Sequence, residues 1–180
     1  MEKNMAWHAS AVPAQDLAEG PAQVDPALAD AAERRRLSGP AMRTFLAIAD
    51  RWRLSEEQRL RLLGLPGRST FYAWAERARR GERLTLGLDV LLRISAVLGI
   101  HNGLRIVFPR EQDAIAWLSA PNQGPLFGGQ RPIDLITCGT QDGLRAVRRH
   151  LDAWRGGHFA APNAADRDAP PLRDQDIVIA

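Results

Sequence analysis

Apolar residues recur at helical spacing along most of this sequence, and nowhere do they alternate with polar residues over a strand-length run. Near position 45 and again near position 144 they stand three or four positions apart, which is the spacing of one helical face. The sequence therefore predicts an all-α fold. The two clearest apolar faces consist of Phe45, Ile48, Ala49 and Trp52 in one helix and Leu144, Val147, Leu151 and Trp154 in the other.

The first helix is expected to begin near Ser38, which can cap it, with Pro40 in its first turn. Residues 1–37 before it are rich in alanine, contain three prolines and have almost no aromatic or β-branched residues. A segment of this composition cannot bury much apolar surface. The sequence therefore predicts a disordered N-terminal arm over 1–37.

Two further helices in the first half are separated by a tight turn. The second helix is expected to start at Ser55, a good N-cap followed by two acidic residues, and to stop at Gly64. A turn over 65–67 follows, and the third helix is expected over about 68–80. Two short helices joined by a glycine-containing turn are typical of a helix-turn-helix. In that motif the second helix enters the major groove of DNA.

A fourth helix is expected from near Thr85 to Leu98, with Gly99 as a left-handed stop. Its apolar residues cover two faces, which indicates a helix buried on both sides. Packing between two units, a dimer contact and simple core packing all fit this pattern. A short helix is expected over 101–108, and another over 111–120.

The stretch from Ala120 to Gly157 combines a loop rich in proline and glycine with two predicted helices. Pro132 fits the first position of a short helix, where its missing N–H costs nothing. A longer amphipathic helix follows and is expected to stop at paired glycines, Gly156 and Gly157. On physical grounds alone this stretch is a small helical unit with one ordered loop.

The net charge of +3 conceals an uneven distribution. Residues 1–33 carry one lysine against six acids, residues 34–83 carry thirteen arginines against five acids, and residues 84–180 carry ten of each sign. The basic block suits a polyanion, most simply DNA, although arginine-rich helix faces also serve solubility. The residues of the third helix with chemistry suited to bases and phosphates are Arg68, Ser69, Thr70, Tyr72 and Arg77.

Residues that could carry catalysis or hold a metal or cofactor are scattered. The four histidines have no metal-ligand spacing, and Gly128–Gly129 lacks the Lys-Ser/Thr of a phosphate-binding loop. The single cysteine, Cys138, excludes an internal disulfide and fits a reducing, cytoplasmic compartment. No apolar run approaches the ~18 residues that a membrane-spanning helix needs. We therefore expect a non-enzyme with no cofactor, no metal and no membrane partner.

An ordered series of rare residues in the second half resembles a known module. The "PN" step at 121–122, the "GG-x-x-P-hydrophobic-D" turn at 128–134 and the "G-x-x-x-V" helix at 143–147 are similar to the toxin-binding domain of the Xre/MbcA/ParS antitoxin family. The resemblance extends back through the helix-turn-helix and covers about 45–159. It implies an Xre-type helix-turn-helix with connecting helices over 38–108, a toxin-binding domain over 109–159 and a flexible tail over 160–180.

The resemblance implies an antitoxin of a type II toxin–antitoxin system. Its expected partner is a RES-domain toxin that depletes NAD, whose active site the C-terminal part blocks, and its helix-turn-helix is expected to repress its own operon. A homodimer is expected within the larger complex, because a single helix-turn-helix reads few base pairs of operator DNA. The expected toxin-binding residues are Phe127, Gly128, Gly129, Arg131, Gly156, Gly157, His158 and Phe159, with the two phenylalanines as aromatic anchors.

Two other functions fit the same residues. The chain could be a stand-alone helix-turn-helix repressor whose C-terminal domain only oligomerises. It could also be a protein-binding module whose helix-turn-helix has lost its affinity for DNA. A toxin gene beside this one favours the antitoxin, and a salt-dependent shift of operator DNA separates the two alternatives from each other.

Overall fold

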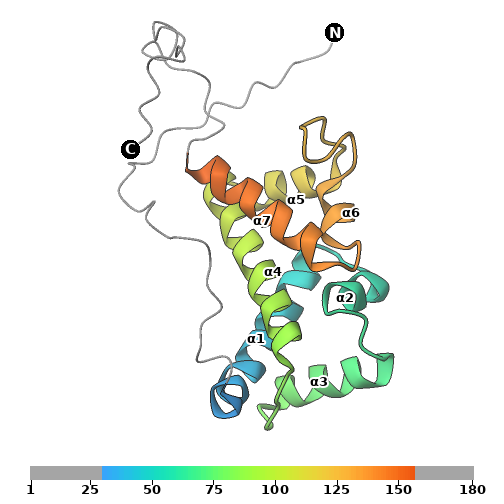
Figure 1. Cartoon of the computed structure of the whole chain (residues 1–180), viewed down its shortest axis with the longest axis vertical. Helices are drawn as coiled ribbons and strands as arrows, with labels where there is room; N and C mark the ends of the chain where they lie inside the picture. The colour runs from blue at the N-terminus through green and yellow to red at the C-terminus, as the bar shows by residue number, and fades with distance from the viewer. Residues whose placement is uncertain (1–29, 157–180) are drawn as a thin grey trace, which may run out of the picture.

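The computed structural model describes residues 30–156, which form seven α-helices and no strand (Figure 1). The predicted all-α fold class is therefore confirmed. In chain order the helices are α1 (Ala31–Arg51), α2 (Glu56–Leu62), α3 (Arg68–Arg80), α4 (Leu88–Val107), α5 (Glu111–Ser119), α6 (Pro132–Ile136) and α7 (Gln141–Arg155).

Helix α1 begins at Ala31, well before the expected start at Ser38. Asp30 is its N-cap, and its side chain accepts a hydrogen bond from the backbone N–H two residues on, at 3.1 Å. Pro40 lies inside the helix. The predicted disordered arm is thus wrong over residues 31–37, which are helical. The rest of that arm, 1–29, lies outside the described residues, as does the predicted tail 160–180.

Ser38 is buried inside α1 and connects it to the segment before α4. Its Oγ donates a hydrogen bond to the Arg34 carbonyl at 2.6 Å and accepts one from the Leu86 backbone N–H at 2.8 Å. A serine in a helix interior commonly bonds to the carbonyl four residues earlier. The residue type that suggested a helix start therefore serves a tertiary contact instead.

The predicted second and third helices are confirmed as α2 and α3. Ser55 and Gln58 form a capping box at the start of α2, with hydrogen bonds of 2.9 and 3.2 Å. Gly64, with φ of 83°, lies in the turn after α2, and Gly81, with φ of 70°, ends α3. Both glycines adopt the left-handed backbone that side chains disfavour.

Helix α4 continues through Gly99 to Val107, so the expected stop at this glycine is wrong and two predicted helices are one. A Cβ on Gly99 would lie 2.7 Å from Nε of Arg148 in α7, and one on Gly103 would lie 3.1 Å from the Leu151 Cβ. The two glycines therefore serve close helix packing. Their lack of a side chain lets α7 approach α4.

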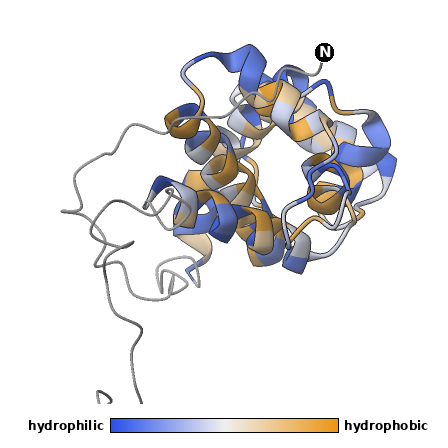
Figure 2. Cartoon of the chain, turned by 90° about the horizontal axis from the view of Figure 1, so that it is seen from above, coloured by the Kyte–Doolittle hydropathy of each residue, from blue (hydrophilic) through white to orange (hydrophobic). Residues whose placement is uncertain are grey.

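The long, apolar α4 packs between α1 and α7, as its two apolar faces predicted. By length and mean hydropathy α4 could cross a membrane, but its packing against both neighbours accounts for its apolar residues. One hydrophobic core runs from Met42 in α1 to Leu151 in α7. Seen from above, apolar positions turn toward neighbouring helices, and hydrophilic positions gather on the outer sides (Figure 2).

Polar contacts join the start of α4 to the loop between α6 and α7. The Arg93 side chain, only 12% exposed, pairs with Asp89 at 2.7 Å and donates a hydrogen bond to the Gly139 carbonyl at 3.1 Å. The Gln141 side chain donates a hydrogen bond to the other oxygen of Asp89. The Asp89–Arg93 pair within α4 therefore also takes part in a tertiary contact.

Helix α3 and the loop after α5 lie at opposite ends of the described structure (Figure 1). Helix α3 lies along the lower end in that view, whereas α5, the loop over 120–131 and the last turn of α7 lie at the upper end. Helix α4 spans the distance between them. The chain thus presents two separate surfaces on one core.

Candidate functional site

The outer face of α3 carries three of the five predicted DNA-facing residues. Phe71 and Ala75 are buried, and they define the inner side of the helix. At about 100° per residue, Ser69, Thr70 and Arg77 project away from that side. All three are exposed, and Arg77 makes no ion pair with another described residue. This face is free to meet a ligand with hydroxyl and guanidinium groups.

The other two predicted residues, Arg68 and Tyr72, both contact Glu56 at the start of α2. The Tyr72 hydroxyl donates a hydrogen bond to one carboxylate oxygen at 2.5 Å, and Arg68 Nε lies 2.9 Å from the other. The hydrogen bond to Glu56, and then the carboxylate charge, raise the pKa of Tyr72. The Arg68 side chain nevertheless remains 75% exposed. Sequence reasoning missed Glu56, because nothing local links it to a helix sixteen residues away.

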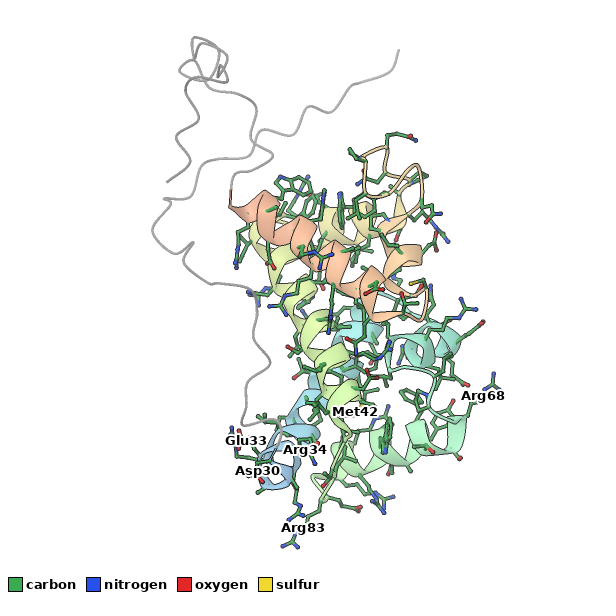
Figure 3. The ribbon with its side chains drawn as sticks, in the orientation of Figure 1. Asp30, Glu33, Arg34, Met42, Arg68 and Arg83 are labelled. Atoms are coloured by element: carbon green, nitrogen blue, oxygen red, sulfur yellow. The ribbon has the colours of Figure 1, made fainter. Side chains whose placement is uncertain are left out.

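Arginines from separate segments surround α3 at the lower end of the molecule. Figure 3 shows Arg34 at the start of α1 and Arg83 after α3 at this same end, with Arg68 at the outer end of α3. Part of the basic block predicted from charge is thus gathered at this end, whereas Arg51 of the same block pairs with Glu111 of α5. Within the described residues, six exposed arginines of this block form no ion pair; they are Arg35, Arg43, Arg53, Arg77, Arg79 and Arg83.

The loop after α5 is closed by backbone hydrogen bonds that explain its "PN" and "GG" steps. Asn122 N–H donates to the Gln130 carbonyl at 3.1 Å, and Gly129 N–H donates to the Asn122 carbonyl at 2.8 Å. The Asn122 side chain accepts a further bond from Gly124 N–H at 2.8 Å. Gly128 and Gly129 have φ of 54° and 87°, which glycine adopts without strain. The loop is therefore ordered, as predicted.

Phe127 anchors this loop to the core and is not the exposed anchor that the sequence suggested. Its side chain is 3% exposed, and its ring contacts Trp117 of α5 at 5.7 Å and His150 of α7 at 5.0 Å between centroids. Edge-to-face contacts of this kind hold aromatic rings in place. The exposed apolar residue of the loop is its neighbour Leu126, at 38%. Exposure of one neighbour and burial of the other could not be predicted without the tertiary packing.

Arg131 makes an intramolecular contact at the start of α6. Two of its nitrogens donate hydrogen bonds to the two carboxylate oxygens of Asp134, both at 2.7 Å. This hydrogen bonding, followed by the carboxylate charge, raises the pKa of Arg131. Gly156 follows α7 and is half-buried. The remaining predicted toxin-binding residues, Gly157, His158 and Phe159, lie outside the described residues.

His150, which contacts the rings of Trp117 and Phe127, makes the stability of the fold depend on pH, because burial lowers the pKa of His150 from its usual value. Between the folded and unfolded pKa values the unfolded chain binds more protons, so stability falls as pH decreases. We expect the wild-type chain to lose thermal stability between about pH 7 and pH 5. A His150→Gln variant should lose less over that range, as measured by CD melting.

His101 provides the control for that measurement. Burial, and then the charges of Arg51 and Arg105, lower its pKa in the same direction. A His101→Gln variant should therefore reduce the remaining pH dependence separately. Equal losses in the wild type and in the His150 variant would contradict the role assigned to His150.

Within residues 30–156 no group of three or more His, Cys, Asp or Glu is placed to hold a metal. A hollow of about 240 Å³ is lined by residues of α1, α4 and α5, among them the Arg51–Glu111 pair at 3.7 Å. Cys138 is exposed, with Sγ 3.2 Å from the Thr140 hydroxyl. None of the predicted site residues lines this hollow.

Two family models match the chain. The model described as "Antitoxin Xre-like helix-turn-helix domain" matches residues 31–99, and the model described as "Antitoxin Xre/MbcA/ParS C-terminal toxin-binding domain" matches residues 103–157. The first match starts where α1 starts, and the boundary between the two matches lies inside α4. A curated protein of Sinorhizobium fredii, named "Uncharacterized protein y4oB", is 40% identical over 116 residues, which are 64% of this chain and 84% of the relative. No solved structure gives a significant match.

Proposed function

Because the chain belongs to the Xre/MbcA/ParS antitoxin family, we propose that it neutralises a RES-type, NAD-depleting toxin in a type II toxin–antitoxin pair. The observation that carries this proposal is one chain with an Xre-like helix-turn-helix at one end and the toxin-binding domain of the family at the other. The family does not itself suggest an enzyme. Neutralisation therefore acts through binding, by occupation of the active-site cleft of the toxin.

The ordered loop at the upper end supports a role in toxin binding. Its backbone bonds and the buried Phe127 hold it against α5 and α7 before any partner arrives. A preordered surface loses less conformational entropy on association. Leu126 and Gly128 lie on the exposed side of this loop, where an apolar contact and a close backbone approach are both available.

The arginine-rich lower end supports autorepression. Arg77, Arg79, Arg35 and Arg83 are exposed arginines without an ion pair, and they offer charges to phosphates. The N-terminal part of α3 offers Ser69 and Thr70 to base edges. In a homodimer, two α3 helices can contact the two halves of a two-fold symmetric operator. The dimer acts in the cytoplasm as part of the toxin–antitoxin complex. This surface lies far from the toxin-binding loop, so one chain can contact both partners.

Co-expression with the adjacent reading frame tests the proposal directly. The neighbouring gene product should co-purify with a tagged form of the antitoxin. Cells that express both proteins should grow normally and maintain their NAD level. The purified complex should also shift DNA from the promoter region of the operon in a salt-dependent manner. Growth arrest and NAD loss despite co-expression would contradict neutralisation of this partner.

A stand-alone repressor is the second candidate, because the unpaired arginines at the lower end favour DNA binding independently of any toxin. Under this function the protein shifts promoter DNA but captures no neighbouring gene product. The same purification therefore separates the two functions.

A further inference from the structure

Glu56 joins the two helices of the helix-turn-helix at the end where α3 begins. It is the first residue of α2, and its two carboxylate oxygens contact Tyr72 and Arg68 on α3 at 2.5 and 2.9 Å. Both partners are candidate DNA-facing residues. One carboxylate therefore holds two candidate DNA contacts in place.

The pairing of Glu56 with Arg68 differs from an ordinary surface ion pair. Oε1 of Glu56 is buried, and no described residue donates a hydrogen bond to it. Removing a carboxylate oxygen from water is unfavourable unless a nearby charge compensates. The Arg68 guanidinium, with Nε at 2.9 Å, supplies that compensation. Arg68 is thus held in place because the buried carboxylate oxygen of Glu56 needs a positive charge nearby.

Most of the Arg68 side chain nevertheless stays open to a ligand. It is 75% exposed, and Figure 3 shows it at the outer end of α3, directed away from the body of the molecule. An arginine can bond to O6 and N7 of guanine with two nitrogens of its fork. Because the Glu56 carboxylate already holds the Arg68 side chain at Nε, the guanidinium group loses less rotamer freedom when it binds a base.

We propose that Glu56 is a specificity-determining positioning residue that orients Arg68 and Tyr72 for base contact while it weakens binding to DNA in general. The inference rests on the proposed DNA-binding function. A carboxylate beside the recognition helix repels phosphates of every sequence. The orientation that it imposes on Arg68 favours only sequences with a base in the right place. Glu56 therefore lowers the affinity for DNA of any sequence and increases the preference for the operator over other sequences.

The test compares Glu56→Gln with Glu57→Gln in the full chain. Glu57 provides a matched control, because it is the next residue and its loss changes the charge equally, but it pairs with Arg61 on its own helix at 2.6 Å. Fluorescence anisotropy measures binding to a duplex from the promoter region of the gene and to a scrambled duplex of equal composition. Both variants should bind scrambled DNA more tightly. Only Glu56→Gln should lower the promoter-to-scrambled ratio, by about tenfold.

Arg68→Ala and the double variant show whether Glu56 acts through Arg68. If it does, adding Glu56→Gln to Arg68→Ala causes no further fall in the ratio. Tyr72→Phe removes only the hydroxyl contact, and it should produce a smaller fall than Glu56→Gln. CD melting confirms that each variant is folded, and Tyr72→Phe replaces Glu56→Gln as the test if the latter unfolds.

The outcomes separate the inference from the function on which it rests. Wild-type protein without preference for the promoter duplex contradicts both. A wild-type preference that Glu56→Gln leaves unchanged, or that Glu57→Gln lowers equally, overturns the inference alone. A further fall in the double variant assigns Glu56 a direct contact with DNA and also overturns the positioning role.

Discussion

The Gly143→Ala variant should be about 3 kcal/mol or more less stable than the wild type, because the added methyl group meets backbone. Gly143 is buried in the first turn of α7, where a Cβ would lie 2.2 Å from the Leu135 carbonyl oxygen and 2.8 Å from Cys138 Sγ. The carbonyl cannot move without displacing α6. Urea unfolding followed by CD should show a lower midpoint.

Gly99→Ala is the matched control for that loss. It also adds a methyl group to a helical glycine, but the Cβ would meet the side chain of Arg148, which can move aside. Alanine also favours the helix over glycine by about 0.5–1 kcal/mol, which offsets part of the strain. The control should change stability by less than about 1 kcal/mol. Similar losses at both glycines would show that backbone contact is not the cause.

Truncation after Trp154 should abolish toxin neutralisation while the helix-turn-helix remains folded. The cut removes Arg155, Gly156 and all that follows, including the predicted contacts at 157–159. The retained part of α7 includes the buried Leu144, Val147 and Leu151 and also Trp154, whose ring contacts Phe108 at 5.5 Å. Growth and cellular NAD with the toxin co-expressed measure the effect, and CD with promoter binding checks the fold.

Truncation after Ala160 is the control for that experiment, since it keeps the predicted contacts and removes only the tail. We expect it to preserve most or all of the protection. Full protection by the shorter protein, cut after Trp154, would place the blocking surface elsewhere. The ordered loop over 120–131 is then the remaining candidate.

The all-α fold and the helix-turn-helix were predictable from the sequence because their signals are local. The capping box at Ser55, the left-handed Gly81 and Pro132 at the start of α6 each act within a few residues of the boundary that they set. Phe71 and Ala75 likewise stand four positions apart in the sequence, and both lie on the buried inner face of α3. The concentration of arginines also indicated the charged end, since charge adds up whatever the packing.

Burial and partner choice depended on residues far away in the chain, and local patterns carry no such information. Ser38 has the chemistry of a cap, but the Leu86 N–H, forty-eight residues on, recruits it into the core. Gly99 has the chemistry of a stop, but α7 packs across it and the helix continues. Phe127 has the chemistry of a surface anchor, yet Trp117 and His150 enclose it. Each residue type permits two uses, and only the arrangement of the helices selects one.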